Sequence, residues 1–119
     1  DSAEVLFAME RITREIEQSS DIDITQSIFN SDTSRLALRT SSGGTNFIEL
    51  KLPERTIQIR RSPGTSDPLT SLDVPIQSLR FTNRSQPQRP GVIFIRITPQ
   101  ALTTPFETAV TYRTLIETL

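Results

Sequence analysis

Residues 1–20, DSAEVLFAMERITREIEQSS, hold the only long helical pattern in this chain of 119 residues. A helix turns by about 100° per residue, and at that angle one narrow stripe of the segment is apolar. Charged side chains occupy the opposite face in its second half, which predicts an amphipathic helix laid against a sheet. The stripe that we expect to enter the core consists of Val5, Met9, Ile12 and Ile16.

The first two turns depart from this pattern, because apolar side chains also lie outside the core stripe. A helix that is apolar nearly all round is normally buried all round, yet one sheet can cover only one face. We therefore expect a second contact surface, formed by Ala3, Leu6 and Phe7 with Arg11 and Arg14 from the polar face. Its partner would be a missing segment of the chain, a membrane or another subunit.

Alternating apolar residues after the helix predict antiparallel strands. Residues 36–52 alternate on both sides of a turn at residues 41–44, which predicts a hairpin. Pro53 and Glu54 allow a second reversal into residues 56–61, so three strands follow one another in a meander. We expect one antiparallel sheet built in this order.

The strongest strand signal lies at residues 92–98, a β-branched and aromatic run that predicts a central strand covered along most of its length. Residues 106–119 predict a closing strand, with a helix from Thr111 onward as the alternative. Residues 62–71 and 82–90 are polar and contain proline, and they predict surface connections.

The composition fits one domain over residues 1–119. A net charge of −1 and a pI near 5.4 give no electrostatic attraction for nucleic acid, so we expect no such partner. No cysteine is present, which excludes a disulfide framework and thiol chemistry. The chain begins without Met, with no recognisable signal peptide or membrane span, and we expect it to start inside a longer helix.

Residue types that usually perform catalysis are scarce. Histidine is absent, and the acidic side chains are scattered as expected for solvated charge. We therefore expect no enzyme activity, no cofactor and no small-molecule substrate. Asp21 with Asp23 comes closest to a calcium-binding pair, but an oxygen cage needs more ligands. Gly43 with Gly44 predicts a turn, since no helix start with a lysine follows to cradle a phosphate.

Arginines in the second half of the chain could form a basic patch. Solvated strand faces and loop tips explain them more simply. The six are Arg60, Arg61, Arg80, Arg84, Arg89 and Arg96.

Four phrases of the sequence, MERITREIEQSSDI, SPGTSDPLTSLDVPIQSLRFT, FIRIT and FETAVTYRTLI, together resemble the soluble domain of type IV pilin-like proteins, particularly minor pseudopilins and minor pilins. The resemblance implies an α+β fold, with an N-terminal helix packed across an antiparallel meander sheet. It also implies a non-enzymatic structural subunit of a type IV pilus-like or type II secretion pseudopilus filament.

Other pilin or pseudopilin subunits would then be the partners, and the place would be the periplasmic or extracellular side of the bacterial cell envelope. In this family an apolar first half of the helix anchors the protein in the inner membrane before assembly. Major pilins often close a loop with a cysteine pair, and major pseudopilins bind calcium in a C-terminal loop. Neither pattern occurs here, which favours a minor subunit.

A second interpretation stays open. An α+β domain of the cell envelope could stand free and hold a peptide or glycan on its sheet. The apolar first turns of the helix would then serve as a patch for self-association.

Overall fold

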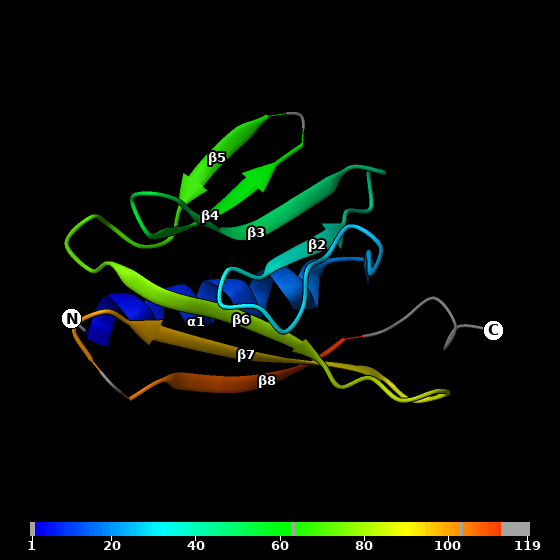
Figure 1. Cartoon of the computed structure of the whole chain (residues 1–119). Helices are drawn as coiled ribbons and strands as arrows, with labels where there is room; N and C mark the ends of the chain where they lie inside the picture. Colours follow the sequence, from blue (N-terminus) through cyan, green and yellow to red (C-terminus); the bar gives the residue numbers. More distant parts are fainter. Residues whose placement is uncertain (1, 63, 103, 113–119) are drawn as a thin grey trace.

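The computed structural model describes residues 2–62, 64–102 and 104–112, and its architecture is α+β, with one N-terminal helix and antiparallel strands (Figure 1). The helix ends where the N–H and the hydroxyl of Ser19 both donate to the carbonyl of Ile16. The elements in chain order are α1 (Ser2–Gln18), β1 (Asp21–Ile22), β2 (Arg35–Arg39), β3 (Thr45–Lys51), β4 (Thr56–Arg61), β5 (Thr65–Pro68), β6 (Ile76–Asn83), β7 (Gly91–Pro99) and β8 (Phe106–Tyr112).

The strands form two sheets, which corrects the expectation of a single one. Strands β1 to β5 pair in sequence order in the larger sheet, and β6, β7 and β8 form the smaller one, all antiparallel. After β5 the pairing with β4 extends by one more hydrogen bond, from the N–H of Leu69 to the carbonyl of Ile57. The chain then starts a new sheet at β6 instead of adding a sixth strand to the first.

The loop between β1 and β2 joins the two sheets. The N–H groups of Asn30 and Ser34 donate to the carbonyls of Phe81 and Leu79 in β6, and the N–H of Leu79 donates back to Asp32. These bonds cover the edge of β6 that faces the larger sheet, an edge that would otherwise leave backbone groups unpaired. In Figure 1 α1 runs behind β6, close to where the two sheets meet.

One continuous core lies between α1 and both sheets. The helix contributes the predicted stripe, and Val5, Met9, Ile12 and Ile16 are buried together with Ala8. Strands β3, β4 and β7 contribute alternate residues, as the two-residue period of a pleated strand requires. In β6 the register shifts between Ile76 and Ser78, so that Ile76 and Leu79 both reach the core. The largest fully buried side chains of the strands are Leu36, Leu38, Ile48, Ile57, Ile59, Ile76, Leu79, Phe81, Ile93 and Ile95.

Most strand predictions are confirmed. The hairpin predicted for residues 36–52 is β2 with β3, in which Leu36 stands opposite Ile48. Its turn contains Gly43 with a φ of 94°, a conformation that glycine adopts without strain. The third strand is β4, and the closing strand β8 runs to Tyr112. The part of this last prediction that concerns residues 113–119 lies outside the described residues.

Two strand predictions need correction. The surface connection predicted for residues 62–71 contains β5, an exposed edge strand. Because its residues show no apolar alternation, no pattern in the sequence predicts this strand. Strand β7 is central, as predicted, but its burial is confined to one face. Ile93, Ile95 and Ile97 are buried, whereas Arg96 on the other face is exposed, because only the core side of this sheet is covered.

Candidate interaction surface

The helix presents an apolar surface that neither sheet covers. Ala3, Phe7, Arg11 and Arg14 follow one another at spacings of three and four residues, which places them on one side of the helix. We call these four residues, together with Leu6 beside them, the exposed stripe. Phe7 is 51% exposed and its neighbour Leu6 is 55% exposed.

The arginines of the exposed stripe are held close to the helix. Arg14 donates to Glu10 at 2.8 Å, and Arg11 lies 4.0 Å from Glu15. The guanidinium of Arg11 also lies over the ring of Phe7, 5.9 Å from its centroid. The stripe therefore combines an aromatic ring with paired charges, which leaves Leu6 and Phe7 as its main apolar area.

A hollow of about 550 Å³ borders the stripe at Phe7. Its lining also includes Leu72, which is 68% exposed and enlarges the apolar surface. The N–H of Ser71 donates to the carboxylate of Glu4, and this bond ties the loop after β5 to the first turn of the helix. Sequence reasoning missed Leu72, because the loop also contains Leu69 and Val74, which are buried, and no periodic pattern separates the exposed leucine from them.

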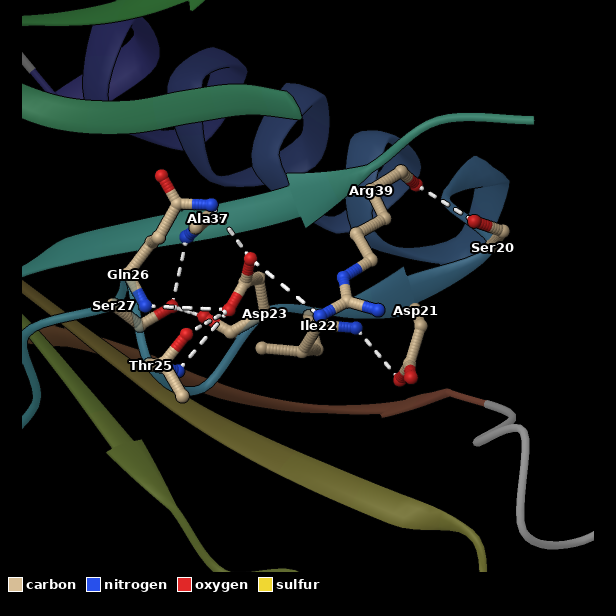
Figure 2. Close-up of polar contacts among 9 residues, drawn as sticks. All are labelled: Ser20, Asp21, Ile22, Asp23, Thr25, Gln26, Ser27, Ala37 and Arg39. Carbon is tan, nitrogen blue, oxygen red and sulfur yellow. Dashed lines mark hydrogen bonds and ion pairs between the residues drawn. The ribbon is translucent and has the colours of Figure 1, made fainter. Parts of the chain in front are cut away.

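Asp21 and Asp23, the nearest approach to a metal-binding pair, have separate partners (Figure 2). Asp21 accepts a hydrogen bond from the N–H of Ile22. One oxygen of Asp23 accepts from the hydroxyl of Thr25 at 2.7 Å, and the other accepts from the side-chain amide of Gln26 at 2.7 Å. Within residues 2–62, 64–102 and 104–112, no group of three potential metal-ligating side chains occurs.

The Asp23 carboxylate fastens the loop that joins the two sheets. Only 5% of the residue is exposed, and Arg39 stands 3.6 Å from its second oxygen. The hydrogen bonds from Gln26 and Thr25 lower the pKa of Asp23 to about 2. Ser27 completes the arrangement, since its hydroxyl donates to the carbonyl of Asp23 and accepts from the N–H of Ala37 (Figure 2). The cluster is therefore structural.

Five of the six arginines considered as a basic patch divide between the two sheets, and Arg89 lies in the loop between β6 and β7. On the larger sheet, Arg60 pairs with Glu49, and Arg61 pairs with both Glu15 and Asp67. A second group, made of Arg80, Arg84 and Arg96, gathers on the outer face of the smaller sheet beside Phe94. The pairing of β6 with β7 brings the three arginines of this second group together. No local sequence pattern specifies that pairing.

Comparison of the chain with models of protein families, with curated proteins and with solved structures gives no match. Within the described part of the chain, no helix has both the length and the apolar character needed to cross a membrane.

Proposed function

We propose that this chain is the globular domain of a non-enzymatic filament subunit of the type IV pilin-like class, which contacts neighbouring subunits through the exposed stripe. The observation that carries the proposal is the exposure of Leu6 and Phe7 on the side of α1 that the sheets leave open. Soluble proteins rarely leave grouped large apolar side chains in water unless a partner covers them.

The architecture supports the same proposal. A single amphipathic helix backed by antiparallel strands is the arrangement that the sequence resemblance implies. The core stripe of α1 fixes the helix to the sheets, so the opposite stripe is presented rigidly. A rigid apolar surface loses little conformational entropy when a partner binds it.

In this proposal the subunit belongs to a type IV pilus-like or type II secretion pseudopilus filament. Before assembly an apolar extension of α1 would hold the protein in the inner membrane, with this domain on the periplasmic side. The gene sequence upstream of Asp1 and the mass of the mature native protein test this part. A short leader followed by about twenty apolar residues is expected for a membrane-spanning helix. A conventional signal peptide cleaved at Asp1 would contradict it.

The contact role is tested by Phe7→Asp in the full-length protein expressed in its native host. Phe7 is half exposed and Arg11 lies over its ring, so the substitution should lower the free energy of unfolding by only about 1 kcal/mol. Incorporation into sheared filaments, measured by immunoblot, should fall at least tenfold, because a carboxylate would have to be buried at the contact.

Ile24→Asp provides the matched control. Ile24 is 57% exposed and lies in the loop between the sheets, away from the exposed stripe. This variant should assemble like the wild type. Wild-type incorporation of the Phe7→Asp protein would refute the contact role, as would an equal loss in both variants.

A further inference from the structure

The outer face of the smaller sheet carries an unusual arrangement of charge. Arg80 in β6 stands directly opposite Arg96 in β7. Side chains at directly opposed positions lie about 5 Å apart at Cβ, and like charges there are destabilising. Each arginine turns to its own carboxylate, since Arg80 contacts Asp32 at 3.0 Å and Arg96 contacts Glu107 at 3.0 Å. The two carboxylates come from different elements. Asp32 lies in the loop between β1 and β2, and Glu107 lies in β8.

Arg84 adds a third positive charge to this face. Its guanidinium stacks on the ring of Phe94, 4.1 Å from the centroid. Among the described residues, no carboxylate forms an ion pair with it. Stacking fixes the plane of the guanidinium and leaves its N–H edge able to bind an oxyanion with two hydrogen bonds. Three guanidiniums against two carboxylates leave this surface with a positive excess.

A hollow of about 380 Å³ lies between these side chains. Hydroxyl groups of Ser78, Thr82 and Thr98 line it together with the arginines. Among the described residues, the only apolar side chain in the lining is Phe94, which Arg84 covers, so this surface lacks the apolar pocket in which a protein partner usually anchors. Its chemistry instead suits a ligand that offers carboxylates and hydroxyl groups together.

We propose that this face binds an acidic glycan, with a uronate carboxylate on Arg84 and sugar hydroxyls on the threonine hydroxyls of β6 and β7. The inference is independent of filament assembly. The outer strand face lies on the opposite side of the smaller sheet from the core that α1 covers, so binding there would leave the exposed stripe accessible.

Titration of the ¹⁵N-labelled protein with tetragalacturonate, followed by NMR, tests the proposal. Amide shifts should be confined to β6, β7 and the residues beside them, and the affinity should fall as salt is added. Arg84→Gln should weaken binding at least tenfold, because a charge-assisted double hydrogen bond is lost. Arg84→Lys keeps the charge but not the stacking or the double bond, and it should bind with intermediate affinity.

Arg60→Gln is the matched control, since Arg60 also stacks on a phenylalanine ring, 4.5 Å from the centroid of Phe47, but lies in β4 of the larger sheet. It should leave binding unchanged. Maltotetraose tests the need for charge, and tetraglutamate tests the need for a sugar; both should bind at least tenfold more weakly than tetragalacturonate. The proposal is overturned if tetragalacturonate does not bind at millimolar concentration or if Arg84→Gln binds it normally. Equal binding of either comparison ligand would also overturn it.

Discussion

Replacing Asp23 with asparagine should weaken the junction between the two sheets. The wild-type carboxylate accepts hydrogen bonds from Thr25 and Gln26 and stands beside Arg39 (Figure 2). Asparagine has nearly the same shape, but it lacks the charge and presents an NH₂ group where only donors approach. The loop that carries Asn30 and Asp32 to β6 would then lose part of its attachment.

The lowered pKa of Asp23 sets the size of the expected loss in unfolding free energy. The hydrogen bonds from Gln26 and Thr25 lower this pKa from an ordinary value of 3.8 to about 2. A shift of this size corresponds to about 2.4 kcal/mol of stabilisation when the carboxylate is ionised. Arg39 is half exposed, and water screens part of the interaction. We therefore expect Asp23→Asn to lower the free energy of unfolding by about 1–2 kcal/mol at pH 7.

The sign of the pH dependence follows from the lowered pKa. Above about pH 5 Asp23 is ionised in both the folded and the unfolded protein, so its full contribution is present. As the pH falls from 3.8 towards 2 the unfolded state takes up the proton first, and the contribution is lost. Wild type and Asp23→Asn should therefore differ most at neutral pH and least near pH 2.

Urea unfolding followed by circular dichroism at pH 7, 4, 3 and 2 measures this difference. Asp21→Asn is the matched control, since the one hydrogen bond that Asp21 accepts within the described residues comes from the N–H of its neighbour Ile22, and it should cost less than about 0.5 kcal/mol. A constant difference between wild type and Asp23→Asn over the whole pH range would refute the reasoning. An equal loss in both variants would refute it as well.

Two further substitutions probe the packing. An ideal Cβ at Gly91 would lie 2.2 Å from Cζ of Tyr112, so Gly91→Ala should displace the ring and cost about 1–3 kcal/mol. Tyr112 is the only tyrosine in a chain without tryptophan, and unchanged tyrosine emission would contradict the displacement. Glu15→Gln removes the paired contacts with Arg61, at 3.2 and 3.1 Å, and should cost about 1–2 kcal/mol. Hydrogen exchange should then quicken in the second half of α1. The exposed Glu17, changed to Gln, should have no such effect, and equal exchange in both variants would argue against the role of Arg61.

The exposed stripe illustrates how far sequence reasoning reaches in a helix. Leu6 and Phe7 could be assigned to the uncovered side because a helix places residues around its axis at fixed angles. The burial of Val5 and Ile12 followed from the same rule. The hollow beside Phe7 could not be predicted, because its wall at Leu72 comes from a loop that lies far away in the sequence.

The arginines of the smaller sheet illustrate what the sequence cannot predict. Arg80 and Arg96 alternate with buried residues in their own strands, so the sequence places both on an outer face. Only the register between β6 and β7 sets them opposite each other and brings Arg84 onto Phe94. The sequence also left Asp23 as an incomplete metal pair, since its partner Arg39 lies in another strand.

The sequence by itself therefore determined the α+β class, the core stripe of α1 and most of the strands, because helical and strand periods are local properties of the chain. The tertiary structure alone decided that these strands form two sheets, joined through the loop that Asp23 fastens. Pairing between distant segments depends on which backbone edges and charges remain unsatisfied once the core has formed, and no local pattern records that outcome.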